Sequence, residues 1–167
     1  QGRRILAMGC ALLGLLSLTV AAGTAHAQDF YDPESVAWKF RYGLSDAAYS
    51  AGWKEYKEDG YLPIDIEMDK AGSTYSGVWQ KNTDGRGWVS WRRLGDEQFH
   101  ANWDEYRQKD YLPIDQDAEV IGGQLLYSLI MVENKEGLKW ISKRNLTSEQ
   151  FAENFAANKD EYKPIDI

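Results

Sequence analysis

The chain repeats one pattern of aromatic and aliphatic residues three times, and this repeat constrains the fold more than any other feature. The copies are 50 residues apart at the first step and 51 to 52 apart at the second. Agreement over several columns at a nearly fixed period predicts a tandem array in which each unit packs on its neighbours. The columns are Trp38, Trp88 and Trp140; Leu44, Leu94 and Leu146; Tyr49, Phe99 and Phe151; Trp53, Trp103 and Phe155; and Tyr61, Tyr111 and Tyr162.

Strand and helix signals follow one another within each copy. Residues 75–81 and 88–91 are rich in aromatic and β-branched residues, which predicts two strands. Phe99, Trp103 and Tyr106 then recur at helical spacing, which predicts a helix with a buried aromatic stripe. Each unit should therefore combine a small sheet with one helix that covers it.

A proline-containing pentapeptide, Tyr-Leu-Pro-Ile-Asp, occurs at residues 61–65 and 111–115, and a near copy lies at 162–166. Proline lacks the amide hydrogen that a helix interior or a central strand uses, so the pentapeptide predicts an early or edge strand entered directly from the helix. Its aspartate is then free to bond a neighbouring backbone N–H or to face outward. We interpret the pentapeptide as scaffold rather than as a site.

The predicted fold class is α+β, built from tandem repeats of a three-stranded antiparallel β-meander plus one helix. The expected boundaries are a partial unit at 36–59, full units at 61–109 and 111–158, and a terminal strand at 162–167. The two incomplete ends complement each other. We therefore expect the N-terminal strand at 36–41 to share a sheet with the terminal strand, which would close the array and protect its edges.

Residues 1–27 have the pattern of a secretory signal peptide. Arg3 and Arg4 precede an apolar run that ends at the small-x-small sequence Ala25-His26-Ala27. The alternative, a single membrane anchor, is disfavoured because glycines interrupt the run and no charged stop-transfer residues follow it. Cleavage would leave residues 28–167 as one domain, secreted or periplasmic in a bacterium and without membrane association.

Composition excludes several classes of function. The chain has 26 acidic and 19 basic residues and a net charge of -7, so we expect neither nucleic acid nor an anionic membrane as a partner. Its one cysteine, Cys10, lies in the signal segment, and His100 is the one histidine beyond that segment. Disulfides, a thiol nucleophile, a metal site and a bound cofactor are therefore not expected.

No catalytic constellation is evident in the sequence, although an enzyme is not excluded. No serine beyond residue 27 has the Ser-x-x-Lys spacing of a β-lactamase-like nucleophile. His100 should lie on exposed helix surface. Asp65, Asp115 and Asp166 recur in the pentapeptides, but acids on a strand are ordinarily solvated, and a glycosidase needs one of them in a pocket that raises its pKa.

Basic residues recur between the column tryptophan and the helix start, a selective pattern in so acidic a chain. A cation beside a helix N-terminus can hold a carboxylate or another anion. The competing interpretation is a salt bridge to a pentapeptide aspartate of a neighbouring unit, which would tie the units together. The candidate ligand-binding residues from this pattern are Arg41, Arg92, Arg93, Lys143 and Arg144.

Two of the seven tryptophans stand outside the repeated tryptophan columns. Trp79 and Trp91 have no tryptophan counterpart in the other copies, whereas most of the rest are explained as core. Stacked indoles are a common means of holding sugar rings or peptide chains. Trp79 and Trp91 are therefore predicted to lie on an exposed contact surface for a protein, peptide or glycan ligand.

The repeated columns and the pentapeptide resemble the bacterial tandem repeat domain 1 family over residues 36–167. The sequence Arg41-Tyr42-Gly43-Leu44-Ser45 is similar to that family's Arg-His-Gly-Leu-Thr motif. The resemblance implies secreted, non-catalytic repeats like those in the N-terminal part of polyglycine hydrolases, whose catalytic part is a separate serine β-lactamase-like domain. Tyr42, Arg92 and Arg144 replace the family's histidine, so a role for that imidazole is not expected here.

From these observations we expect a non-catalytic binding or interaction module. The alternative is a hydrolase, or the substrate-recognition part of one, that acts on an extracellular polymer or peptide.

Overall fold

The computed structural model describes residues 4–9, 36–69 and 73–166. The predicted signal peptide therefore lies outside the described residues, apart from the short strand β1. The elements in chain order are β1 (Arg4–Gly9), β2 (Trp38–Leu44), α1 (Asp46–Glu58), β3 (Tyr61–Met68), β4 (Tyr75–Lys81), β5 (Trp88–Leu94), α2 (Asp96–Gln108), β6 (Tyr111–Ile121), β7 (Gln124–Glu133), β8 (Lys139–Arg144), α3 (Ser148–Asn158) and β9 (Tyr162–Asp166).

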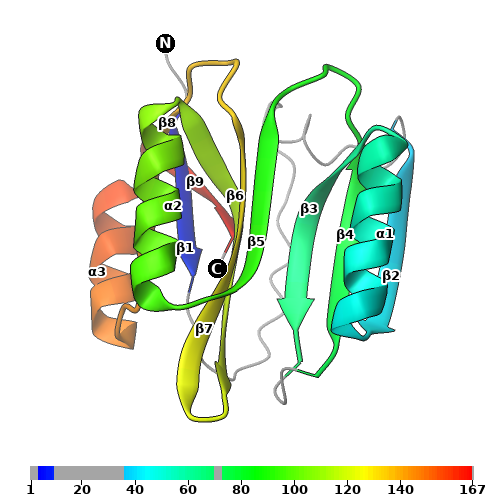
Figure 1. Cartoon of the computed structure of the whole chain (residues 1–167). Coiled ribbons are helices and arrows are strands. Elements are labelled where there is room, and N and C mark those ends of the chain that lie inside the picture. The colour runs from blue at the N-terminus through cyan, green and yellow to red at the C-terminus, as the bar shows by residue number, and fades with distance from the viewer. Residues whose placement is uncertain (1–3, 10–35, 70–72, 167) are drawn as a thin grey trace.

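Two similar units form most of the molecule (Figure 1). Each has a three-stranded antiparallel sheet, in the order β2-β4-β3 for the first unit and β5-β7-β6 for the second. Helix α1 covers the first sheet and α2 covers the second (Figure 1). The predicted α+β class is confirmed, as are the tandem repeats of a three-stranded antiparallel sheet with one helix.

The strands are grouped differently from the predicted meander, which would place β3, β4 and β5 in one sheet. Instead β4 is the central strand between β2 and β3, and β5 belongs to the next sheet. The turn after β4 does not close a hairpin, because the Asn82 side chain bonds both the N–H and the carbonyl of Arg86 and directs the chain into the next unit. A structural unit therefore runs strand, helix, hairpin.

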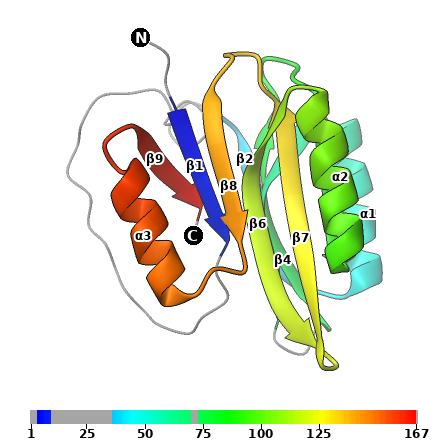
Figure 2. The same ribbon diagram turned by 90° about the vertical axis from the view of Figure 1, so that its left-hand side faces the viewer.

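The expected pairing of residues 36–41 with the terminal strand is not formed, because β2 is the third strand of the first sheet. Strand β9 pairs instead with β1, in a third sheet of order β8-β1-β9 whose pairings are both parallel. Strand β1 thus takes the central place that β4 and β7 hold in the other sheets (Figure 2). The N-terminal and C-terminal strands do meet, but the sheets do not close into a barrel.

The three helices begin at polar or small caps that follow a left-handed residue. Ser45 caps α1 by accepting the Ala48 N–H at 3.3 Å, and Thr147 caps α3 by accepting the Gln150 N–H at 3.2 Å. The residues two positions before each cap are Gly43, Arg93 and Asn145, with φ values of 62°, 57° and 57°. The same sharp strand-to-helix turn is therefore made three times.

The core is aromatic and is shared between the units. Ile66, Leu112 and Ile130 belong to one buried cluster although they come from two sheets. Trp79 is 1% exposed and packs against Tyr49 and Tyr56, with ring centroids 5.5 and 5.1 Å apart. The prediction that Trp79 lies on an exposed contact surface is therefore wrong.

Gly77 explains how so large a ring fits inside the sheet. A Cβ atom at Gly77 would lie 2.8 Å from the Trp79 ring, so the absence of a side chain there leaves room for the indole.

Among the described helices none is long and apolar enough to cross a membrane.

Replacing Trp79 by alanine should lower the free energy of unfolding by about 3 to 5 kcal/mol, because a buried ring is lost and a cavity remains. The control is Tyr42→Ala, whose ring is 76% exposed and whose loss should change stability by less than about 0.5 kcal/mol. Urea unfolding followed by circular dichroism measures both. A Trp79 cost as small as that of Tyr42 would contradict the described core.

Candidate functional site

Arg92 ties the second unit to the helix of the first. From the end of β5 its guanidinium donates to Asp46 Oδ1 at 2.9 Å and to Ser50 Oγ at 2.7 Å, both on α1. It also lies over the rings of Tyr49 and Tyr75, 4.7 and 5.0 Å from their centroids. A planar cation held between a carboxylate and two ring faces is a specific contact between units.

Arg144 makes the same contact one unit later. It forms an ion pair with Asp96 in the first turn of α2, and its guanidinium lies 4.5 Å from the Phe99 centroid and 4.8 Å from that of Tyr127. The sequence-based alternative to ligand binding was a salt bridge from these arginines to the pentapeptide aspartates. The arginines instead pair with the first residue of the preceding helix, so Asp46 and Asp96 are the partners that sequence reasoning missed.

The pentapeptide aspartate has a different role at the contact between the two units, which we call the junction. Asp115 is 8% exposed and accepts the backbone N–H of Ile66 at 3.1 Å. Two residues on, Asp117 accepts the N–H of Met68 at 3.2 Å. Both N–H groups lie on β3, the outer strand of the first sheet, so β6 side chains satisfy backbone groups that the sheet leaves unpaired. This is one of the two arrangements expected for the pentapeptide aspartate.

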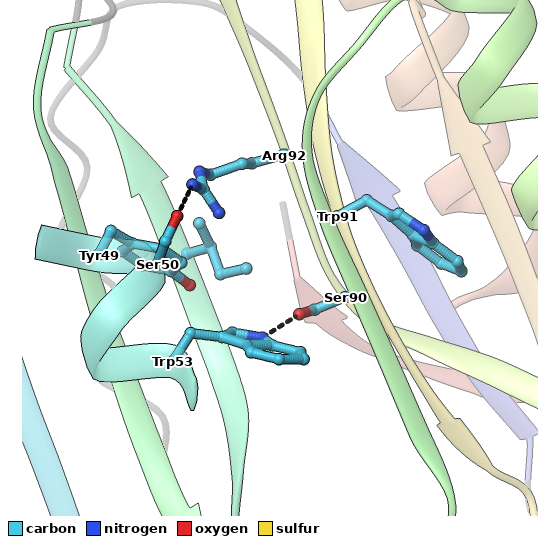
Figure 3. Close-up of a pocket in the computed structure, with 7 residues that line it drawn as sticks. Tyr49, Ser50, Trp53, Ser90, Trp91 and Arg92 are labelled. Atoms are coloured by element: carbon cyan, nitrogen blue, oxygen red, sulfur yellow. Dashed lines mark hydrogen bonds between the residues drawn. The ribbon is translucent and has the colours of Figure 1, made fainter. Parts of the chain in front are cut away.

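A cleft of about 220 Å³ lies between α1 and β5 (Figure 3). Across it Trp53 Nε1 donates to Ser90 Oγ at 2.9 Å, and Arg92 bonds Ser50. The indole of Trp91 points away from Arg92 in Figure 3 and packs edge-on against Tyr106, with centroids 5.2 Å apart. Two of the polar contacts at this cleft, Trp53 with Ser90 and Arg92 with Ser50, therefore run from one unit to the other.

Arg41 and Arg93, the other two predicted arginines, also have internal partners. Arg41 Nε donates to Tyr56 Oη at 2.7 Å within the first unit. Arg93 donates to Tyr75 Oη at 3.4 Å and so adds another contact between the units. Lys143, the remaining predicted basic residue, lines a further groove.

That groove, between α2 and β8, has a volume of about 520 Å³. We call it the lysine groove and define it by Trp103, Arg107, Lys139, Trp140 and Lys143; Asp110 is the one acidic residue among those that line it. The two indoles meet edge-on at 5.5 Å, and the Arg107 guanidinium lies 5.2 Å from the Trp103 centroid. Lys139 and Lys143 are exposed, and neither has an ion-pair partner among the described residues.

Sequence reasoning found Lys143 but missed the other four residues of the lysine groove. A comparison of the repeat columns carries the signal that could have found them. Lys139 and Lys143 stand where the second unit has Gly87 and Trp91, so this junction has two cations that the preceding junction lacks.

The remaining ionisable groups do not form a reactive centre in the described part of the chain. His100 is exposed on α2, as predicted. Over residues 4–9, 36–69 and 73–166, no group of three His, Cys, Asp or Glu side chains is placed to hold a metal ion.

A family model described as the polyglycine hydrolase-like structural repeat matches residues 35–82 and 85–134, more than half of the 167 residues. The chain belongs to this repeat family. The two matches span β2 to β4 and β5 to β7, so each repeat of the family corresponds to one sheet with its helix. The resemblance inferred from the repeated columns is thereby confirmed. No curated protein matches the chain.

The junction can be tested by a double-mutant cycle on Arg92 and Asp46. Arg92→Met should lower the free energy of unfolding by about 1 to 2 kcal/mol, because it removes an ion pair and two ring contacts. Asp46→Ala should cost less, about 0.5 to 1 kcal/mol, and the two effects should couple by about 0.5 kcal/mol or more. The control is Lys54→Met, exposed on α1. Additive effects in the double variant would contradict the ion pair.

Asp65 gives a pH-dependent test. Burial raises the pKa of its carboxyl above the ordinary value, and no hydrogen-bond donor reaches the carboxylate within the described residues. The folded chain therefore holds this proton to a higher pH than the unfolded chain, and the stability that the proton supplies is lost as pH rises through the raised pKa. Asp65→Asn should accordingly gain stability relative to wild type between pH 3 and pH 7.

Urea unfolding at several pH values measures this difference. Glu58→Gln, exposed on α1, is the matched control for loss of one carboxylate. A difference between Asp65→Asn and wild type that stays constant or falls with rising pH would contradict the account of Asp65.

Proposed function

We propose that the chain is a secreted or periplasmic binding module without catalysis of its own, and that it binds an anionic glycan in the lysine groove. The observation that carries the proposal is a groove lined by two tryptophans and by two exposed lysines that have no ion-pair partner among the described residues. Secretion is supported by the signal-peptide pattern at residues 1–27.

The chemistry of the lysine groove suits a charged sugar polymer. Ammonium groups bind carboxylate or sulfate as point charges. Arg107, which pairs with Asp104 at 3.3 Å on the exposed surface of α2, adds a planar donor that can form two parallel bonds to one carboxylate if it exchanges this partner. Indole surfaces contact the apolar faces of sugar rings. A volume of about 520 Å³ falls within the range of ordinary ligand sites.

The recurrent arginines are less suited to hold a ligand. Arg92 and Arg144 already bond helix aspartates and lie against aromatic rings, so an anion would have to displace internal partners. This favours the lysine groove, where Lys139 and Lys143 have no ion-pair partner among the described residues, over the arginine column that the sequence first suggested.

The alternative is the substrate-recognition part of a hydrolase, which the description of the repeat family favours. In that case the chain would bind the polymer, and a separate catalytic domain would cleave it. Incubating a binding polymer with this chain alone distinguishes the two, because a module without catalysis leaves the polymer length unchanged.

Calorimetric titration of the full chain with oligogalacturonate tests the site, with maltohexaose as the uncharged control. We expect binding of the charged oligosaccharide that weakens with added salt, and a loss of at least about tenfold in the double variant Lys139→Gln/Lys143→Gln. The matched control is Lys54→Gln/Lys159→Gln, which removes the same charge elsewhere. Equal binding of maltohexaose, or an undiminished affinity in the first double variant, would contradict the proposal.

Secretion is tested separately by expression in a Gram-negative host and mass spectrometry of the periplasmic fraction. The proposal predicts a product that begins at Gln28. This product lacks β1, so the β8-β1-β9 sheet would be present only before cleavage. Full-length protein retained in the cytoplasm would contradict secretion without bearing on the lysine groove.

A further inference from the structure

Strand β2 exposes three aromatic side chains on one face. Trp38, Phe40 and Tyr42 are 56%, 52% and 76% exposed, and the rings of Phe40 and Tyr42 stack with centroids 6.0 Å apart. Lys39 and Arg41, which alternate with them, both contact Tyr56 on α1. The aromatic face of β2 is therefore turned away from its own helix, and a patch of this kind commonly marks an interaction surface.

The corresponding faces of β5 and β8 are covered by the helix of the preceding unit. Trp88 meets Trp53 of α1 with centroids 5.4 Å apart, and Trp140 meets Trp103 of α2 at 5.5 Å. Trp38 occupies the same column as Trp88 and Trp140. Among the described residues no helix takes the equivalent place on β2.

Helix α3 presents the complementary surface. Phe155 occupies the column of Trp53 and Trp103, and it is 38% exposed. Phe151, one turn earlier, stacks with it at 6.3 Å and an interplanar angle of 7°. None of the α3 residues is buried: Phe151 is half-buried and Phe155 is partly exposed. Among the described residues no strand packs on this side of α3 as β5 packs on α1.

At two pairs of positions, β2 and α3 differ from the inner junctions in a way that keeps the two faces complementary. The first pair concerns charge. Within the chain an arginine at the end of the strand pairs with an aspartate at the first position of the helix, as in Arg92 with Asp46. At the uncovered faces the equivalent residues are Tyr42 and Ser148, so both charges are absent together. Contact between these faces would leave no unpaired arginine or aspartate at the junction.

The second match concerns a hydrogen bond. In the first junction Ser90 Oγ accepts the indole N–H of Trp53. The equivalent residues at the uncovered faces are Phe40 and Phe155, so donor and acceptor are again absent together. The two faces therefore fit each other as an apolar version of the contact that already joins the units.

We propose that α3 of one copy of the chain packs on β2 of a second copy, which repeats the junction between units as a contact between molecules. The proposal does not depend on the lysine groove. The contact joins two different faces and leaves one of each free, so it propagates head to tail into open chains unless its rotation closes a ring. Because association costs freedom that the covalent junctions do not lose, the assembly should depend on protein concentration.

Sedimentation velocity on end-blocked variants of the full chain tests the proposal. Phe40→Glu blocks the β2 face and Phe155→Glu blocks the α3 face, and both residues are exposed enough for the fold to be retained, which circular dichroism verifies. Wild type should form larger species as concentration rises, whereas each variant alone should stay monomeric. An equimolar mixture of the variants should form a 1:1 dimer, because one intact face of each kind remains.

Other outcomes identify other occupants and overturn the proposal. Self-association of Phe155→Glu would mean that β2 faces pair with each other. A mixture that stays monomeric, or a wild type that stays monomeric at all concentrations, would mean that no second copy covers β2. The control Ala51→Glu, exposed on α1, should behave as wild type.

The register of the contact is tested by restoring the ion pair of the inner junctions. Tyr42→Arg and Ser148→Asp should each weaken assembly by about threefold or more, since each places one unpaired charge at the contact. The double variant should assemble at least as tightly as wild type, because its two new charges pair with each other. If the two substitutions weaken assembly independently in the double variant, the proposed register is wrong. Whether α3 packs on β2 at all is decided by the end-blocked variants.

Discussion

The packing of α1 on β5, and of α2 on β8, is the contact on which the rest of the structure depends. A unit of about 50 residues buries too little apolar surface to be stable alone. Here the missing burial comes from the next unit, where a tryptophan pair and an arginine lie across the helix face. The repeated sequence columns exist because the same junction is built more than once.

The same junction also solves a backbone problem. The outer strand of each sheet exposes N–H groups that invite pairing with another chain. Asp115 of the second pentapeptide and Asp117, two residues on, each accept one such group from β3, so together they protect an edge and join two sheets. This explains why a pentapeptide that looks like a site is used as scaffold.

Sequence alone predicted the parts that depend on local chemistry. The helices, the strand that follows each helix and the α+β repeat class follow from periodicity and from proline. The grouping of strands did not, because whether the turn at 82–85 closes a hairpin depends on bonds to Arg86. The burial of Trp79 was missed because its counterpart in the second unit is Met131, itself 0% exposed, which hides a core column behind a change of residue type.

The arginines show a related limit. Their recurrence was visible in the sequence, but the choice between a pentapeptide aspartate and a helix aspartate depends on how far one unit lies from the next. Lys143 belongs to the same recurrent set and yet lines a groove, whereas Trp91 at the equivalent position of the second unit packs against Tyr106 of its own helix. Differences between copies, more than the repeat itself, therefore point to where a ligand or a second molecule could bind.

Native-state hydrogen exchange tests most directly whether the junction makes the units into one cooperative body. The amides of the two central strands, β4 and β7, should exchange with the same opening free energy, equal to that of global unfolding. Exchange from β4 at a clearly lower free energy than from β7 would show that the first unit opens alone, and would contradict the central role given to the junction.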